Sequence, residues 1–349
     1  MVAPTGPQNG LAVDGYYFDP VTRCCTYLPD LPNFLVGGIL SDTDPAAEAG
    51  RATVEQRIAA GIGVSPLGLA PSPVFTLLYR NSEGSFGKSR TLACPHLLKD
   101  TGQCGIWRHR NSVCATWFCK HVRGKLGRGF WIDSLHPLLQ IVETELSRWC
   151  VLEMHLATDA LRHLISSETW TTDEPAVTGD SIDGRVNQKH YGEIWGEWRG
   201  HEAEFFRRCA GLVQPLSWTD VISICGPQSR ALAQLTQQAW RRLVSEDIPP
   251  TVETGEIKLV RIRNATARVV TYSGYDPLDV PADLMELLYY FDGRPTEDAL
   301  TAIAEERGFR IEPDLLRKLF DFGLLVPGQD RRAEPPDSPR GATPSGCSQ

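Results

Sequence analysis

The chain has 349 residues, of which 42% are hydrophobic and 22% are charged, and its formal net charge is −8. These values are typical of a globular protein with two or three domains, and they exclude a largely disordered chain. The acidic balance also argues against non-specific nucleic-acid binding by the whole molecule, because such binding needs a basic surface.

The N-terminal segment and the cysteine content allow a prediction of the cellular compartment in which the protein resides. Residues 1–15 are rich in Gly and Pro and are expected to be flexible, and they lack the basic and apolar regions of a secretory signal. Prolines interrupt the uncharged run 59–79, which argues against a membrane span. We therefore expect a cytoplasmic protein with no membrane partner. In a reducing compartment, ten cysteines are more typical of metal or catalytic sites than of a disulfide framework.

Residues 16–130 show a broken pattern of short apolar runs and turn residues, which is typical of a small core that a metal stabilises. Within it we expect a helix over 41–57. The stretch PVFTLLYR, residues 73–80, predicts a strand, and the Gly-rich sequence after it predicts a turn. We interpret the whole range as a cysteine-rich metal-binding domain.

Residues 131–245 favour helices. Apolar residues recur at every third or fourth position from Ser134 onward, which predicts one helix of about 34 residues. Asp133 or Ser134 can cap its start. Two further helices are expected over 188–213 and 227–245. This range is therefore expected to form a helical bundle.

Residues 251–327 form a last unit, in which two strands precede three helices. Alternating residues over 256–274 predict a hairpin that turns at Asn264. The helices are expected over 281–291, 296–308 and 313–322, followed by a closing strand at 324–326. This order is that of a winged-helix-like domain, so the fold class is α+β. Residues 328–349 are rich in Pro, Ser and Gly and are expected to be a disordered tail.

Six of the cysteines fall within about 100 residues in the N-terminal part of the chain, and thiolates are soft ligands that bind zinc, iron and iron–sulfur clusters. The predicted metal ligands are Cys24, Cys25, Cys94, Cys104, Cys114 and Cys119, with His109 and His121 ranked behind them. Iron or an iron–sulfur cluster is preferred slightly, because no CxxC pair gives the regular spacing of a zinc ribbon, and zinc is the alternative. Cys24 and Cys25 are adjacent, so they either serve different metals or only one of them is a ligand.

The sequence around the last three of these cysteines is uniformly basic. Six basic residues and no acidic residue occur between positions 104 and 130: Arg108, Arg110, Lys120, Arg123, Lys125 and Arg128. A centre of four thiolates and one dication carries about two negative charges, which nearby cations would stabilise. We expect these residues to balance thiolate charge rather than to bind phosphate.

The cysteine pattern resembles the YkgJ-like cysteine-cluster family, whose members are described as putative zinc- or iron-chelating proteins. The similar stretches are TRCCTYLPDLPNFLVGG and ACPHLLKDTGQCGIWRHRNSVCATWFC, which together cover about residues 16–124. The resemblance points to the same six cysteines, with Cys119 at the least regular position. The chain lacks the cysteines that usually precede the CC pair, and it has Asn111 where the family commonly has Pro. The resemblance implies chelation and no particular reaction.

The C-terminal sequence from VPADLMELLYYFDGRPT to FDFGLLVP is similar to PqqD-like domains, which are small winged-helix units that recognise peptides in enzymes modifying ribosomal peptides. The similarity covers about 251–327. Residues 282–322 include five basic and ten acidic residues, and this negative balance disfavours phosphate binding. The similarity implies a peptide or protein partner that pairs with the hairpin edge, and a scaffold or dimerisation role is the alternative.

Other polar clusters are interpreted as surface features. Glu193, Glu197, His201 and Glu204 share one stripe of the expected helix, more than 100° from its apolar face at 100° per residue. His155, Asp159 and His163 form a similar ladder, and a buried metal site there is the minor alternative. Cys150 and Cys209 are expected in the core, and Cys225 is expected in a loop.

The sequence therefore predicts a metal-binding cysteine-cluster protein with a peptide- or partner-binding C-terminal domain, as a redox or accessory component of a modification pathway. The alternative is an adaptor in which the metal is purely structural. Whether the protein is an enzyme stays open, since no GxGxxG, GxxxxGK[ST], HExxH or GxSxG motif occurs.

Overall fold

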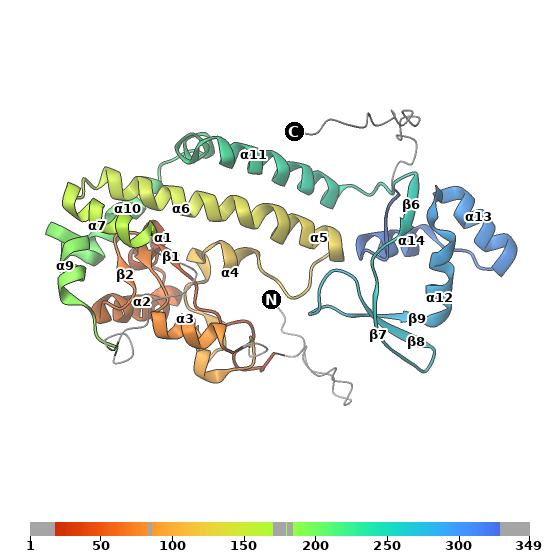
Figure 1. The fold of residues 1–349 in the computed structure, drawn as a ribbon, viewed down its shortest axis with the longest axis horizontal. Coiled ribbons are helices and arrows are strands. Elements are labelled where there is room, and N and C mark those ends of the chain that lie inside the picture. Colours follow the sequence, from red (N-terminus) through yellow and green to blue (C-terminus); the bar gives the residue numbers. More distant parts are fainter. Residues whose placement is uncertain (1–17, 83–85, 170–178, 180–183, 329–349) are drawn as a thin grey trace, which may run out of the picture. The chain divides into compact units, whose positions relative to one another are not determined.

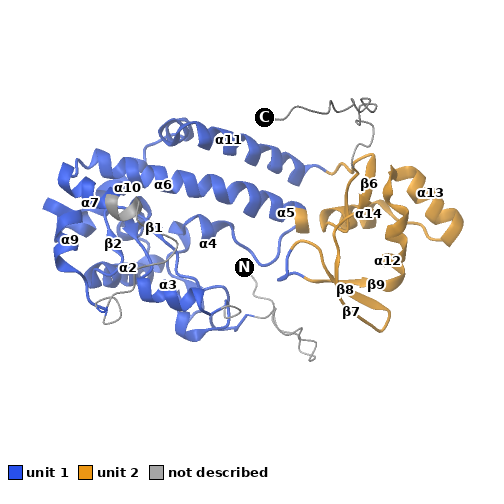
Figure 2. Ribbon diagram, viewed as in Figure 1, with its two compact units in different colours: residues 1–122, 126–245, 273–276 blue, residues 123–125, 246–272, 277–349 orange. Residues whose placement is uncertain are grey.

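A computed structural model describes residues 18–82, 86–169, 179 and 184–328. The chain is of the mixed α+β class and divides into two compact units (Figure 2). Unit 1 comprises 1–122, 126–245 and 273–276, and unit 2 comprises 123–125, 246–272 and 277–349. The flexible segment 1–15 and the disordered tail expected from the sequence lie outside the described residues, except for Gly328, and so does Cys347.

The N-terminal part of unit 1 consists of short elements joined by turns. Its helices are α1 (Asn33–Ser41), α2 (Glu48–Ala60), α3 (Pro73–Arg80) and α4 (Ser112–Thr116). Its strands are β1 (Leu31–Pro32), β2 (Val64–Ser65), β3 (Gly68–Leu69), β4 (Leu97–Leu98) and β5 (Gln103–Cys104). Strands β1, β3 and β2 form one antiparallel sheet in that order, with Leu69 opposite both Leu31 and Val64, and β4 pairs with β5.

The strand predicted at residues 73–80 is wrong, because this stretch forms helix α3. Ser72 has extended backbone angles, and its side chain accepts a hydrogen bond from the N–H of Phe75 at 3.1 Å. Pro73 then occupies the first helical turn, where its missing N–H costs nothing. The Ser-Pro start is a helix N-terminal signal that outweighs the β-preferring residues of this short run.

The remainder of unit 1 is helical, as predicted (Figure 1). Its elements are α5 (Gly124–Phe130, which begins in unit 2), a π-helical turn (Trp131–Leu135), α6 (His136–Glu153), α7 (Thr158–Thr169), α9 (Gln188–Trp195), α10 (Glu202–Val213) and α11 (Trp218–Val244). Among the helices in the described ranges, we find none with the length and apolar character needed to cross a bilayer.

Two predicted helices are each broken into two. The helix expected from Ser134 ends at Glu153, because His155 adopts a left-handed φ of 52°, and α7 follows. The helix expected over 188–213 is interrupted after Trp195, where Gly196 and Gly200 have φ values of 54° and 87°. Glycine adopts such angles without steric penalty, so these two positions allow the chain to turn between α9 and α10.

The third predicted helix begins earlier than expected. Ser217 and Asp220 form a capping box that starts α11 at Trp218, and the helix kinks at Gly226, whose φ is 77°. Cys225 therefore lies within α11 and is buried, rather than in a loop as predicted. Cys150 and Cys209 are both fully buried, which confirms their prediction as core residues. Glu197, His201 and Glu204 are exposed, as their helical stripe predicts.

The main core of unit 1 joins its N-terminal part to its helical part. Its largest fully buried side chains are Leu31, Val36, Ile39, Val54, Leu69, Trp195, Phe205 and Phe206. Helix α1 packs closely on α10, because Gly37 lets the two backbones meet at the carbonyl of Phe206. The buried side chain of Asn33 donates to the carbonyl oxygens of Pro66 and Ser147, both at 2.9 Å. Residues 16–130 and 131–245 thus share one core.

The described part of unit 2 contains two three-stranded antiparallel sheets and three α-helices. Its strands are β6 (Thr251–Thr254), β7 (Lys258–Arg263), β8 (Thr266–Val270), β9 (Leu278–Pro281), β10 (Asp292–Pro295) and β11 (Leu325–Pro327). Its helices are α12 (Ala282–Leu287), α13 (Thr296–Arg307) and α14 (Pro313–Asp321). The sheet orders are β7-β8-β9 and β10-β6-β11. The predicted hairpin turn is confirmed, since Asn264 and Ala265 have φ values of 50° and 57°.

The core of unit 2 lies between these helices and sheets. It is formed by Val252, Ala267, Val269, Val280, Leu287, Leu288, Phe291, Ala299, Ile303, Ile311, Leu316, Leu319, Leu324 and Leu325. The predicted stops at Gly308 and Gly323 are confirmed, because both have left-handed φ angles after α13 and α14. Asp321 is buried and accepts hydrogen bonds from Arg123, at 2.7 and 2.8 Å, and from Arg317.

The close approach of α1 and α10 predicts opposite effects for two Gly-to-Ala substitutions. A Cβ at Gly37 would overlap the carbonyl oxygen of Phe206, so Gly37→Ala should lower the free energy of unfolding by about 2 kcal/mol or more. Gly211, in α10, has no atom within 4 Å of its own Cβ position, so Gly211→Ala should raise it by about 0.5–1 kcal/mol. Urea unfolding followed by circular dichroism measures both, and equal effects would contradict the packing described.

Candidate metal centre

Unit 1 contains a partly open cavity of about 1050 Å³ that all six predicted cysteine ligands line. These residues are Cys24, Cys25, Cys94, Cys104, Cys114 and Cys119. They come from four separate stretches of chain, and none of the described cysteines forms a disulfide. Sequence-distant thiols are therefore collected around one space.

Backbone hydrogen bonds bring the first stretches together. The N–H of Cys94 donates to the carbonyl oxygen of Cys25 at 2.7 Å, and the N–H of Cys25 donates to that of Thr22 at 2.8 Å. The buried side chain of Thr26 accepts a hydrogen bond from the N–H of Gly87 at 2.6 Å. The turn at Cys24–Cys25 (the CC turn) is thus joined to the turn at Cys94–Pro95 (the CP turn). Since the bond between Cys94 and Cys25 links peptide groups, it does not depend on whether the thiols are protonated or bound to a metal.

Cys104 is placed by the β4–β5 hairpin, in which it lies opposite Leu97. The N–H of Gly105 donates to the carbonyl oxygen of His96 at 2.8 Å and closes the ladder. Gly105 also packs directly on Gly50 of α2, where a Cβ on either residue would overlap the other backbone. Only glycine allows this close contact at the position that directly follows Cys104.

Cys114 lies on the short helix α4, whose start is fixed from two sides. Asn111 caps the helix by accepting a hydrogen bond from the N–H of Cys114 at 3.1 Å. The carboxylate of Glu143 on α6 accepts from the N–H of Ser112 and, at 2.7 Å, from its hydroxyl. Burial raises the pKa of Glu143 to about 7, against the two hydrogen bonds that lower it. Asn111 therefore serves as a cap where the resembling family commonly has Pro.

The thiols have different acidities. A hydrogen bond from Cys25 lowers the pKa of Cys24 to about 7, and the nearby charges of Arg110 and Arg23 act in the same direction. The pKa of Cys25 is raised, chiefly because it donates that hydrogen bond. Burial raises the pKa of Cys94 to about 11 and that of Cys114 to about 12. Cys24 is consequently the thiol that ionises first.

Burial also raises the pKa values of the remaining two thiols, Cys104 and Cys119, and the charge of Cys24 adds to both shifts. The thiols around the cavity therefore oppose one another's ionisation. A bound cation would reverse this effect, because a metal stabilises every thiolate that it binds.

Three of the six basic residues predicted to balance thiolate charge form ion pairs with carboxylates instead. Arg108 lies 2.6 Å from Asp44, Lys120 lies 3.2 Å from Asp276, and Arg123 binds Asp321 within unit 2. Arg110 lines the cavity, and its guanidinium stacks on Trp107 with 3.4 Å between Cζ and the ring centroid. Of the predicted cations, Arg110 is the one whose charge favours ionisation of Cys24, Cys104 and Cys114.

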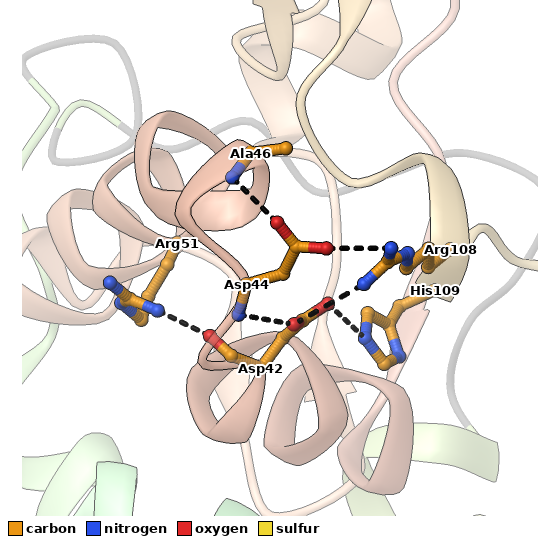
Figure 3. A network of polar contacts seen from close by, with 6 residues as sticks. All are labelled: Asp42, Asp44, Ala46, Arg51, Arg108 and His109. Carbon is orange, nitrogen blue, oxygen red and sulfur yellow. Dashed lines mark hydrogen bonds and ion pairs between the residues drawn. The ribbon is translucent and has the colours of Figure 1, made fainter.

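The two predicted histidines have different surroundings. Nε2 of His109 lies 3.2 Å from a carboxylate oxygen of Asp42. Figure 3 shows this pair. The ring of His109 packs on Gly38. The same figure shows Arg108 held between Asp42 and Asp44. His121 is buried edge-on against Phe118 and is not one of the described residues that line the cavity. His109 thus lines the cavity, and its Nε2 contacts the Asp42 carboxylate.

A third histidine was not predicted. His96 is buried and lines the cavity, with Nδ1 at 2.7 Å from the Thr53 hydroxyl and Nε2 at 3.3 Å from the Arg57 guanidinium. Burial, together with Arg57, lowers its pKa to about 3, so His96 is neutral. Since Arg57 can only donate, Nε2 accepts and Nδ1 carries the proton. His96 positions the CP turn; its place two residues after Cys94 was the signal available in the sequence.

Aromatic residues form another wall of the cavity, which the sequence analysis also missed. Phe18, Phe86, Trp117 and Tyr275 contact one another with ring centroids 5.0–6.2 Å apart. Tyr275 comes from the loop between β8 and β9, of which residues 273–276 belong to unit 1. These residues are too far apart in the sequence to form a recognisable motif.

The six thiols line one cavity, but they do not converge as a compact ligand group. Within the residues that the structure describes, no three His, Cys, Asp or Glu side chains have the geometry to hold a single metal ion. A single-ion site would need side chains to reorient. The donor chemistry nevertheless fits a thiophilic metal, because six thiols and two guanidinium groups without an ion pair among the described residues, those of Arg23 and Arg110, line the same space.

Comparisons with protein-family models, with curated proteins and with solved structures find no match to this chain. Its site is therefore interpreted from its own residues.

The acidity of Cys24 gives a testable order of reactivity. In the reduced, metal-free protein, alkylation of Cys24 by iodoacetamide should reach half its maximal rate near pH 7, whereas Cys94 and Cys114 should need much higher pH. Peptide mass spectrometry after timed labelling measures this. Cys25→Ala removes the hydrogen-bond donor and should move the Cys24 midpoint upward, while Cys25→Ser keeps a donor and should not. An unchanged midpoint in the Ala variant would contradict the assigned cause.

Proposed function

We propose that this protein is a cysteine-cluster metal protein that binds an iron–sulfur cluster through thiols of its N-terminal cavity. The observation that carries the proposal is the convergence of six thiols, from four separate stretches of chain, on one cavity. Structural cysteines are usually dispersed as small apolar residues in a core, like Cys150 and Cys209 here. The six cavity cysteines are grouped instead, as ligands of a common centre are.

The layout of the thiols favours a cluster over a single zinc ion. A single zinc ion needs four ligands directed at one point, at about 2.3 Å for sulfur. In a four-iron cluster each thiolate binds a different iron, so the ligands surround an extended object. Six thiols that line a cavity of about 1050 Å³, with no three donors among the described residues converging on one ion, suit the second arrangement. A zinc site is the alternative, and metal analysis distinguishes it from an iron–sulfur cluster.

The charges of the cavity support a thiolate centre. Arg110 and Arg23 lie close enough to lower the pKa of Cys24, and Arg110 also favours ionisation of Cys104 and Cys114. The resemblance to YkgJ-like chelating proteins rests on the same cysteines. When bound, a cluster would supply electron transfer or Lewis-acid chemistry. The residues described here would hold it, shield it from solvent and set its electrostatic environment.

Metal analysis tests this proposal. Protein purified anaerobically after iron-supplemented expression should contain iron and acid-labile sulfide in nearly equal amounts, with little zinc. Cys104→Ser and Cys114→Ser should each lose most of both, because an alcohol is a poor ligand for iron in a cluster. The matched control is Cys225→Ala, which removes a buried thiol outside the cavity and should keep full loading.

Two results would overturn the proposal. The first is a folded wild-type protein that takes up neither iron nor sulfide in anaerobic reconstitution. The second is stoichiometric zinc that iron and sulfide do not replace, which would assign the thiols to a structural zinc site.

A second candidate function, an adaptor that captures an extended peptide, is favoured by strand β7. This strand lies at the edge of the β7-β8-β9 sheet. Leu259 and Ile262 on it are 53% and 63% exposed, an unusual degree for large apolar residues of a strand. An exposed edge of this kind can accept an additional strand through main-chain hydrogen bonds. The similarity to PqqD-like domains leads to the same candidate.

The charge of β7 defines the peptide that it would accept. Lys258, Arg261 and Arg263 all lie on this strand, and none of them forms an ion pair within the described part of the chain. An acidic peptide with alternating apolar residues would complement both the cations and the exposed Leu259 and Ile262. Elsewhere unit 2 is acidic, which opposes binding of DNA.

Peptide binding at β7 can be measured with two designed probes. The full-length protein should bind a fluorescein-labelled (Glu-Val)4 peptide at least about tenfold more tightly than (Lys-Val)4, measured by fluorescence anisotropy. Leu259→Asp should weaken binding of the acidic peptide about tenfold. The control Leu235→Asp alters an equally exposed leucine on α11 and should have no effect. Equal affinity for the two peptides would exclude this candidate.

A further inference from the structure

Two arginines on the cavity wall have donor groups for which no described residue is the acceptor. Nε of Arg23 is buried, and no described residue accepts a hydrogen bond from it. Arg110 is partly exposed; it donates from Nε to the carbonyl oxygen of Trp107 at 3.2 Å, and its two Nη groups have no acceptor among the described residues. An unsatisfied buried donor costs free energy, so Nε of Arg23 requires an acceptor, and the Nη groups of Arg110 offer further donors on the same wall.

The other charged groups on this wall are satisfied, which sets the two arginines apart. Arg108 lines the same cavity, but Asp42 and Asp44 neutralise it (Figure 3). His109 is likewise placed against Asp42. Arg23 and Arg110 therefore leave positive charge at the cavity, and no described residue accepts from Nε of Arg23 or from the Nη groups of Arg110.

Backbone strain at Arg23 supports the same interpretation. Its φ is 50°, in the left-handed region that costs a residue with a Cβ about 1 kcal/mol or more. Residues held in this conformation cluster at binding sites, where the surrounding structure imposes them. The cost at Arg23 places its guanidinium on the cavity wall immediately before the CC pair.

The cavity also has the size and apolar surface of a small-molecule site. Pockets that enclose an organic ligand measure roughly 300–1,000 Å³ and combine apolar or aromatic walls with a few polar groups. This cavity has about that volume, and its aromatic wall consists of Phe18, Phe86, Trp117 and Tyr275. Rings in edge-to-face contact present a continuous apolar surface on which a flat molecule can pack.

We propose that this cavity binds a small aromatic carboxylate, with its carboxylate on Arg23 and Arg110 and its ring against the aromatic wall. A guanidinium offers paired N–H donors that match the two oxygens of a carboxylate. The proposal goes beyond metal binding and does not depend on it, because neither arginine is a metal ligand. It names small aromatic carboxylates as the class of substrate or effector for the cavity that the thiols line.

The test uses two ligands of the same shape and different charge. Isothermal titration calorimetry of the full-length protein should show 2-naphthoate binding at least about tenfold more tightly than 2-naphthamide, since hydrogen bonds between charged partners contribute most to such a preference. Arg110→Gln and Arg23→Gln should each remove the preference while leaving 2-naphthamide affinity unchanged. Arg148→Gln, the control, removes an exposed arginine that pairs with Glu145, and it should retain the preference.

The conservative variant Arg110→Lys keeps the charge and loses the paired donors, so it should retain part of the preference for 2-naphthoate. It also replaces Arg110→Gln in this test if that variant fails to fold. Each titration is made on metal-free and on anaerobically reconstituted protein, which separates this proposal from the metal proposal. Equal affinity for the two ligands in the wild type would overturn the inference. So would Gln variants that lose iron but keep the preference, because the arginines would then belong to the metal centre alone.

Discussion

The hydrogen bond from the N–H of Cys94 to the carbonyl oxygen of Cys25 is the constraint on which the site depends. The cysteine-bearing stretches have little regular structure of their own, so peptide groups and packing must fix them. This bond joins the CC turn to the CP turn, and the β4–β5 hairpin then places Cys104 beside them. Because the partners are backbone atoms, the thiols stay available for a ligand. The cavity is a product of main-chain geometry rather than of side-chain pairing.

The helical part of unit 1 acts as the support for this irregular region. Asn33 connects two loops to the helices through the carbonyl oxygens of Pro66 and Ser147, and Glu143 on α6 fixes the start of α4. Both side chains are polar and at least partly buried, and both use their hydrogen-bonding capacity on backbone groups. Long helices are thus needed to hold a site to which they contribute few lining residues. A protein with this design concentrates its rigidity away from its chemistry.

The sequence was sufficient where local signals agree with the tertiary structure. The Asn264 turn, the stops at Gly308 and Gly323, and the grouping of six cysteines followed from residue type and spacing. It was insufficient where a single backbone angle decides whether a helix continues or ends. The left-handed angle at His155 has no sequence signal, and apolar periodicity continues across it, so one helix was predicted where two exist. The partners of Arg123 and His96, and the aromatic wall, arise from contacts between distant segments that no local pattern encodes.

Tyr275 belongs to the cavity wall although it lies about 150 residues beyond the last cavity cysteine in the chain. A fragment ending at residue 245 would retain every cavity thiol and every helix of unit 1, and it would still lack this ring. The rings of Phe18, Phe86 and Trp117 would then lose the neighbour that contacts all three of them. Domain dissection of this protein should therefore follow the three-dimensional boundary, in which residues 273–276 accompany the N-terminal unit, rather than a linear cut in the chain.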